Sequence, residues 1–217
     1  TILAGIEKVL SVQELVLQRH VQSLSCGHLG VTLTGGFCAN SSDENPLDVG
    51  GNKYWCKNIA GFLKSLFADQ YVLEIGAGRG WYAKFIQRSD VRDSQSSSVA
   101  KPKSYLAVDG MPFVENHTNG LVKQFDLMDP RNITQFYGVP QPDWVLCLEV
   151  IEHISVRHED VVLDHIFLSA KVGVVFSWGK PGQGGFHHVN LRSSYYAIKT
   201  IQEKYRFKLD LDMTQHL

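Results

Sequence analysis

The sequence predicts an α/β fold with a doubly wound, mostly parallel sheet. From residue 71 onward, short apolar runs alternate with segments of helical periodicity, and strands that alternate with helices form a parallel sheet covered on both faces. The first run leads into a glycine-rich turn and then into a helix. The 217 residues, 44% of them hydrophobic, suit one α/β domain with a sizeable core.

The segment before the sheet predicts helices and a loop. Apolar residues recur at roughly helical spacing over 2–24 and again over 54–67, so each stretch predicts an amphipathic helix. The glycine-rich residues 26–51 between them predict an irregular loop. We therefore expect residues 1–70 to pack, as helices and a loop, on a core domain formed by 71–217.

Six apolar runs predict the strands. They are YVLEIG (71–76), SYLAVD (104–109), LVKQFD (121–126), DWVLCLE (143–149), VGVVFSW (172–178) and FKLDLD (207–212). The polar, serine-rich residues 89–104 interrupt the alternation of strands and helices. Because this stretch lacks any apolar periodicity, it predicts a flexible surface insertion.

The overall charge argues against nucleic-acid and membrane partners. The formal net charge is −1, so no global basic field attracts a phosphate backbone or an anionic membrane. No apolar run approaches the roughly 20 residues that a membrane-spanning helix needs.

The cysteines and glycosylation motifs bear on the compartment. The four cysteines contain no C-x-x-C pair, which argues against a zinc ribbon. They are either four reduced thiols or include a disulfide among the first three, Cys26, Cys38 and Cys56. Three N-x-S/T motifs occur, at Asn40, Asn116 and Asn132. We expect the lumen of the secretory pathway, with the cytoplasm as the alternative, and we expect the natural start of the chain to precede Thr1.

The stretch YVLEIGAGRGW (71–81) predicts a ligand-binding turn. Glycines let the backbone turn sharply and approach a ligand, and the following helix start offers free N–H groups. A dinucleotide site would need the pattern G-x-G-x-x-G. Counted from Gly76, the third glycine comes one residue early, and Trp81 occupies the position that this pattern reserves for glycine. The turn therefore argues against NAD or FAD.

The E-x-G-x-G-x-G form of this turn resembles motif I of the class I S-adenosylmethionine-dependent methyltransferases, whose sheet is Rossmann-like. The resemblance extends over residues 71 to about 212. It implies that Glu74 supports the glycine loop and the cofactor's amino group, that Asp109 binds the ribose hydroxyls and that Asp126 meets the adenine amino group. The implied cofactor residues are Glu74, Gly76, Ala77, Gly78, Gly80, Tyr82, Asp109, Gly110, Asp126, Leu127 and Glu149. The family's sheet usually ends in an antiparallel strand, so we expect that strand to be missing here or replaced by the early segment.

The stretch CLEVIEHIS (147–155) places three ionisable groups at the end of the fourth predicted strand. Ligands of open α/β sheets bind outside the carboxyl ends of the strands. If residues 150–155 form a helical turn, Glu149, Glu152 and His153 share one face. Two carboxylates and an imidazole suit a divalent cation. The alternative is a cluster of satisfied polar groups, or a catalytic base, without a metal.

The loop SWGKPGQGGFHHVN (177–190) supplies a fourth candidate ligand, His187 or His188. The E-x-x-E-H segment followed by a distal histidine resembles plant-type small-RNA 2′-O-methyltransferases and the O-methyltransferases of ubiquinone biosynthesis. The resemblance implies a divalent metal, Mg²⁺, Mn²⁺ or another, that holds the acceptor hydroxyl. The implied ligands are Glu149, Glu152, His153 and His188, and the candidate catalytic groups are His187, His188 and His153.

Together these patterns favour metal-assisted O-methylation of a small polar molecule or of a sugar or glycan hydroxyl. A hydroxyl needs activation because its pKa lies far above 7, and a metal or a histidine base can provide it. Two alternatives remain: a metal-independent N- or O-methyltransferase with a histidine base, and an inactive methyltransferase-like binding module. The stretches TGGFC, GWY, LEVIEH and GQGGFHHVN also resemble a group of animal methyltransferase-like proteins, which indicates no substrate.

Overall fold

The computed structural model describes residues 55–88 and 100–215, together with 13, 16, 17, 20, 21, 24–26, 30–32 and 34–38. The described residues between 13 and 26 are helical. Most of the helix expected over 2–24 and most of the serine-rich insertion expected over 89–104 lie outside the described residues.

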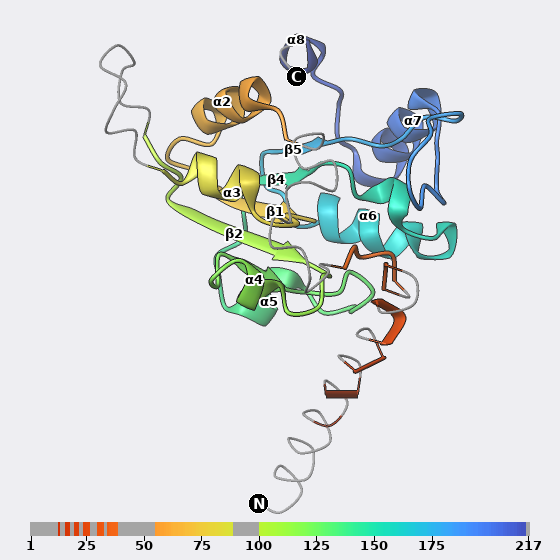
Figure 1. The fold of residues 1–217 in the computed structure, drawn as a ribbon. Coiled ribbons are helices and arrows are strands. Elements are labelled where there is room, and N and C mark those ends of the chain that lie inside the picture. The colour runs from red at the N-terminus through yellow and green to blue at the C-terminus, as the bar shows by residue number, and fades with distance from the viewer. Residues whose placement is uncertain are drawn as a thin grey trace, which may run out of the picture.

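Five parallel strands form one sheet in the part of the chain that the structure describes (Figure 1). They are β1 (Tyr71–Ile75), β2 (Ser104–Asp109), β3 (Val122–Gln124), β4 (Trp144–Cys147) and β5 (Gly173–Phe176). Their spatial order is β3-β2-β1-β4-β5, so the chain starts in the middle, runs to one edge and then crosses back to the other. This arrangement confirms the predicted doubly wound α/β fold.

Helices cover both faces of this sheet (Figure 1). They are α2 (Lys57–Leu66), α3 (Trp81–Ile86), α4 (Val114–His117), α5 (Ile133–Tyr137), α6 (Glu159–Phe167) and α7 (Ser194–Tyr205). The 3-10 turns η1 (Ile151–His153) and η2 (Val156–His158) precede α6, and α8 (Leu211–Thr214) lies apart from the sheet near the C-terminus. Successive strand residues point to opposite faces. Val72 of β1 therefore packs with Leu63 of α2, whereas its neighbour Leu73 belongs to the core under α5, α6 and α7, with Ile133 and Ile166.

The predicted sixth strand, FKLDLD (207–212), is wrong. Residues 206–210 have no regular structure, and α8 begins at Leu211. Arg206 ends α7 in the left-handed region at φ 61°, and the Asp210 side chain accepts a hydrogen bond from the Met213 backbone N–H at 2.9 Å, which starts the next helix. The apolar position Phe207 is explained by packing on Phe167, with ring centroids 5.5 Å apart, rather than by a strand.

The expected loop before α2 contains a disulfide, Cys26–Cys38. The interpretation as four reduced thiols is therefore wrong: Cys56 and Cys147 are free, but the first and second cysteines are joined. Inside the disulfide loop, Val31 and Phe37 form an antiparallel bridge. Each helix in the described parts of the chain is too short or too polar to span a bilayer.

Candidate active site

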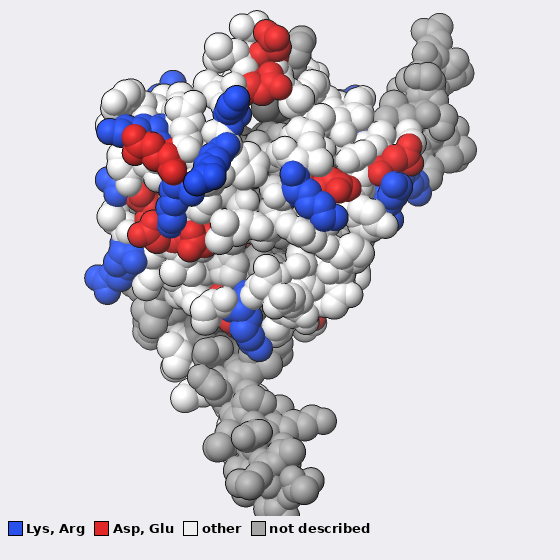
Figure 2. Space-filling view, turned by 180° about the vertical axis from the view of Figure 1, so that it is seen from behind, with Lys and Arg blue, Asp and Glu red and all other residues white. Residues whose placement is uncertain are grey.

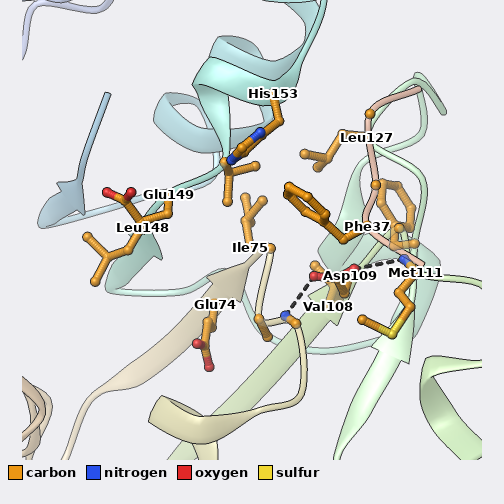
Figure 3. Close-up of a pocket in the computed structure, with 18 of the residues that line it drawn as sticks. Phe37, Glu74, Ile75, Val108, Asp109, Met111, Leu127, Leu148, Glu149 and His153 are labelled. Carbon is orange, nitrogen blue, oxygen red and sulfur yellow. Dashed lines mark hydrogen bonds between the residues drawn. The ribbon is translucent and has the colours of Figure 1, made fainter. Parts of the chain in front are cut away.

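A cavity of about 470 Å³ lies at the carboxyl ends of β1, β2 and β4 (Figure 3). Its walls come from the loops that follow these strands, from the stretch 34–38 and from Phe186 of the loop after β5. Parallel strands end at one edge of the sheet, so their following loops converge there. All of the implied cofactor residues line this cavity except Gly80.

The glycine turn closes tightly under the cavity. Gly76, Gly78 and Gly80 all have positive φ values, of 73°, 53° and 73°. A Cβ atom on Gly76 would lie 2.1 Å from the Val150 Cγ2 atom, whereas one on Gly78 would meet nothing within 4 Å. A Cβ atom on Gly80 would lie 2.9 Å from the Val122 Cγ2 atom. Only glycine therefore fits at position 76, between the loops that follow β1 and β4. At position 78 the backbone leaves open space.

Asp109 joins two loops at the base of the cavity. One carboxylate oxygen accepts a hydrogen bond from the Gly78 backbone N–H and the other from the Met111 backbone N–H, each at 2.7 Å (Figure 3). Burial raises the pKa of Asp109, and these two N–H groups partly offset that rise. The carboxylate therefore fixes the glycine turn at the end of β2.

Glu74 is a buried acid at the end of β1. It is 4% exposed and accepts a hydrogen bond from the Tyr105 hydroxyl at 2.9 Å. Burial raises its pKa to about 8, the Tyr105 bond lowers it, and the Asp109 charge adds a further rise. Asp126 lies beyond β3, where its side chain accepts from the Met128 backbone N–H at 3.0 Å.

Glu152, His153 and His188 come together beside this cavity. One ligand atom from each lies within 4.8 Å of the others. Glu152 is completely buried, and both of its carboxylate oxygens lack a hydrogen-bond partner. Burial raises the pKa of Glu152 to about 7, and the charge of Glu149 adds to the rise. A buried carboxylate that accepts no N–H or O–H hydrogen bond is energetically unfavourable.

The two histidines of this cluster each place Nδ1 near a backbone carbonyl oxygen. The His153 Nδ1 lies 3.2 Å from the His187 carbonyl oxygen, and the His188 Nδ1 lies 3.4 Å from the Gln183 carbonyl oxygen. A carbonyl only accepts, so Nδ1–H is the donor and the lone pair of each neutral ring is on Nε2. Burial also lowers the pKa of His153, which favours its neutral form.

Glu149 is not one of the three residues whose ligand atoms lie within 4.8 Å of one another, but its side chain interacts with that of Glu152, and this contact and its charge raise the pKa of Glu152. Glu149 adopts a left-handed conformation at φ 56°, and the 3-10 turn contains only residues 151–153, so the helical turn expected over 150–155 is shorter than predicted. The Glu149 carboxylate accepts a hydrogen bond from the Ser177 hydroxyl at 2.8 Å, and Figure 3 shows it apart from His153. His187 also has a positive φ, of 58°, and its Nδ1 is buried without a partner. The roles of both residues stay predictions.

No role in the site was predicted for the stretch 34–38 (TGGFC), which connects both ends of the cavity. The Thr34 hydroxyl donates to Asp126 at 3.1 Å, and the Phe37 ring packs edge-on against His153 at 4.7 Å between centroids. A Cβ on Gly35 would lie 2.4 Å from the His153 carbonyl oxygen. The available signal was the glycine pair Gly35 and Gly36 close to Cys38 in a glycine-rich segment.

The close approach of Gly35 leads to a stability prediction. Gly35→Ala should lower the free energy of unfolding by about 2–4 kcal/mol, from about 1 kcal/mol of left-handed strain and about 1–3 kcal/mol of overlap with the His153 carbonyl. Gly182→Ala is the matched control, because Gly182 has φ 83° and open space around its Cβ position. Urea unfolding of both variants compares them, and an equal loss in both would show that the 34–38 contact contributes nothing.

One of the comparisons with known proteins identifies a family. A family model described as a methyltransferase domain matches residues 47–177. No curated protein matches the chain. Among solved structures, it is similar to the methyltransferase domain of bacterial CtHen1-C, with 19% identity, 68% of this chain and 80% of that chain covered, and a TM-score of 0.47.

Two further solved structures show the same level of similarity. The magnesium protoporphyrin IX methyltransferase ChlM from Synechocystis PCC 6803, with bound SAH, has 12% identity over 67% of this chain and 68% of that chain, with a TM-score of 0.47. An O-methyltransferase family protein from Burkholderia thailandensis has 13% identity over 75% of this chain and 55% of that chain, with a TM-score of 0.49.

Proposed function

Because the chain belongs to the methyltransferase domain family, we propose that it transfers a methyl group from S-adenosylmethionine to a hydroxyl oxygen with the help of a divalent cation. The observation that carries this proposal is the Glu152 carboxylate, buried and unpartnered beside His153 and His188. A cation bound by this carboxylate would satisfy its two oxygens, which supports the proposal.

The cavity suits the methyl donor. A volume of about 470 Å³ is within the usual range of small-ligand pockets, roughly 300–1,000 Å³. Asp109 and Asp126, at the ends of neighbouring strands, are proposed to bind the ribose hydroxyls and the adenine amino group. Glu74 is proposed to face the cofactor's ammonium group, which would favour its ionised form. S-adenosylmethionine supplies an already electrophilic methyl group, so the protein's main task is to align the acceptor.

The residues of the cluster fit a divalent cation. Glu152 offers carboxylate oxygens, and His153 and His188 offer Nε2 lone pairs because their Nδ1–H groups donate to carbonyls. Mixed oxygen and imidazole ligands are compatible with Mn²⁺ and with later transition metals. A cation bound there would lower the pKa of the acceptor hydroxyl. The Phe37 ring, packed edge-on against His153, keeps that imidazole in place.

We propose a small polar molecule or a sugar hydroxyl as the acceptor. Phe37 and Phe186 lie at the cavity with 40% and 62% of their surfaces exposed, and their centroids are 6.0 Å apart. Aromatic rings of this kind pack well on flat, partly apolar ligands. Figure 2 shows basic side chains interleaved with acidic ones on the face it displays, without a continuous basic area there.

An acceptor screen tests this function. Labelled S-adenosylmethionine is incubated with the protein and with panels of sugars, phenols and amines in the presence of Mn²⁺ or Mg²⁺. Methylation of hydroxyl acceptors supports the proposal. Methylation of amines alone would favour the metal-independent alternative, and donor binding without any transfer would favour an inactive binding module.

Asp109→Ala should weaken S-adenosylmethionine binding by about 1.5–3 kcal/mol, roughly 10–150-fold, because a hydrogen-bonding carboxylate is lost and the glycine turn is released. Asp143→Ala is the matched control: Asp143 also accepts a backbone N–H bond, from Tyr71 at 2.8 Å, but does not line the cavity. Calorimetry measures the donor affinity of both variants. Unchanged affinity in a folded Asp109→Ala protein would assign the ribose contact to another residue.

We also propose that the protein resides in the secretory lumen. The Cys26–Cys38 disulfide and the exposed sequons Asn116 and Asn132 support this proposal. Mass spectrometry of protein from its native source should find the linked cysteine peptides and a glycan on at least one sequon. Free thiols at both cysteines together with unmodified asparagines would contradict it.

A further inference from the structure

Asn190 is a buried residue whose backbone N–H and carbonyl groups are both hydrogen-bonded, whereas its side-chain amide is not. Its backbone N–H donates to the Glu152 carbonyl at 3.0 Å, and its own carbonyl accepts from the Trp178 indole N–H at 2.8 Å. The neighbouring Val189 N–H donates to the same Glu152 carbonyl at 2.9 Å. The segment after His188 is therefore attached directly to the turn that carries Glu152.

The Asn190 side chain has no partner. The residue is 1% exposed, and neither its amide nitrogen nor its amide oxygen makes a hydrogen bond. Among the described residues, the buried side-chain polar atoms without a partner belong to just three residues: Glu152, His187 and Asn190. All three belong to the two segments that the Glu152–Asn190 backbone bond joins, so the unsatisfied groups are concentrated at one place rather than spread through the core.

This concentration needs an explanation, because leaving a buried amide unpaired is unfavourable and a leucine of similar volume would avoid it. A ligand that satisfies the Glu152 carboxylate and also the Asn190 carboxamide explains both. A carboxamide oxygen is a good cation ligand, and its pairing with a carboxylate oxygen and imidazole nitrogens forms a mixed set.

We propose that Asn190 is a further ligating residue of the cation site, acting through its carboxamide oxygen together with Glu152, His153 and His188. This inference rests on the proposed cation-assisted function. The Asn190 carboxamide oxygen would be a fourth, neutral ligand atom. It comes from a segment whose backbone is hydrogen-bonded to Glu152.

The test measures cation binding directly. The full chain is stripped with chelator and titrated with Mn²⁺ and separately with Co²⁺, with calorimetry for affinity and visible absorption for the Co²⁺ ligand field. Asn190→Leu should weaken binding about 10–100-fold, the usual effect of losing a group that supports a metal site. Asn190→Asp, which adds a charge to the oxygen donor, should bind at least as tightly as the wild type.

Stability separates a ligating role from a structural one. Asn190→Leu should leave the Tm of the cation-free protein unchanged or raise it, because it removes an unpaired buried amide, and should reduce the rise in Tm on adding Mn²⁺. Asn132→Leu is the matched control. Asn132 caps α5 by accepting N–H bonds from Thr134 and Gln135, so its replacement should lower the Tm without changing Mn²⁺ affinity.

The outcomes are distinct. Loss of binding in Glu152→Gln together with a tenfold or greater loss in Asn190→Leu supports the inference. Loss in Glu152→Gln with affinity within about twofold of wild type in Asn190→Leu overturns the role of Asn190 and leaves the proposed function standing. A wild-type protein that binds neither ion overturns both.

Discussion

Replacing Glu152 by glutamine is expected to reduce methyl transfer about a thousandfold or more, while the affinity for S-adenosylmethionine changes by less than about threefold. Lewis-acid activation contributes several kcal/mol to catalysis, and about 4 kcal/mol corresponds to a factor of a thousand. Glu152 does not line the donor cavity, so donor binding should continue. Single-turnover transfer rates and calorimetry on the same sample measure the two effects separately.

Glu159→Gln is the control for this change. Glu159 is also a buried acid, 7% exposed, but it pairs with Arg192 at 2.8 Å and lies away from the cavity. Its replacement should lower the free energy of unfolding, because a buried ion pair is broken, and should leave the transfer rate of the folded protein unchanged. Near-normal transfer by Glu152→Gln would remove Glu152 from the catalytic site.

The second large effect is on stability as a function of pH. Burial raises the pKa of Glu74 from 4.5 to about 8, so the folded protein favours the neutral acid. Because its pKa is higher in the folded than in the unfolded protein, Glu74 contributes fully to the free energy of unfolding below about pH 4.5. This contribution is lost as the pH rises through 8. Between pH 5 and pH 8, the free energy of unfolding of the wild type should therefore fall by about 3 kcal/mol relative to that of Glu74→Gln. The glutamine mimics the neutral acid at every pH.

Urea unfolding of wild type and Glu74→Gln at pH 5, 6.5 and 8 measures this difference, because all other titrating groups are common to both proteins. The free energy of unfolding of the variant relative to that of the wild type should increase steadily with pH. Parallel stability profiles over this range would show that Glu74 is ionised in the folded protein at all three pH values.

The strands and the acids at their ends could be predicted because their signals are local. Apolar runs bounded by glycine or acid define β1, β2 and β4, and parallel pairing then brings Glu74 and Asp109 to one edge without further information. The alternating FKLDLD run carries the same local signal but forms no strand, because Asp210 caps a helix instead. Periodicity reports which side chains are buried, and it does not report whether a neighbouring strand is available.

The parts of the site that could not be predicted depend on backbone conformation or on distant contacts. Glu149 adopts a left-handed conformation, and no residue pattern signals a positive φ at a glutamate. The packing of Phe37 on His153 joins residues more than a hundred positions apart. Asn190 stands out only because its amide is buried without a partner, which is a property of the folded chain.

The central claim is that methyl transfer to oxygen needs a cation held by Glu152, His153 and His188. Its most direct test is the rate of transfer from labelled S-adenosylmethionine to a hydroxyl acceptor in excess chelator and again after Mn²⁺ or Mg²⁺ is restored. We predict that transfer stops in chelator while donor binding persists, and that it returns on adding the cation. Transfer at the full rate in excess chelator would contradict the claim and leave a histidine, His188 or His187, as the base.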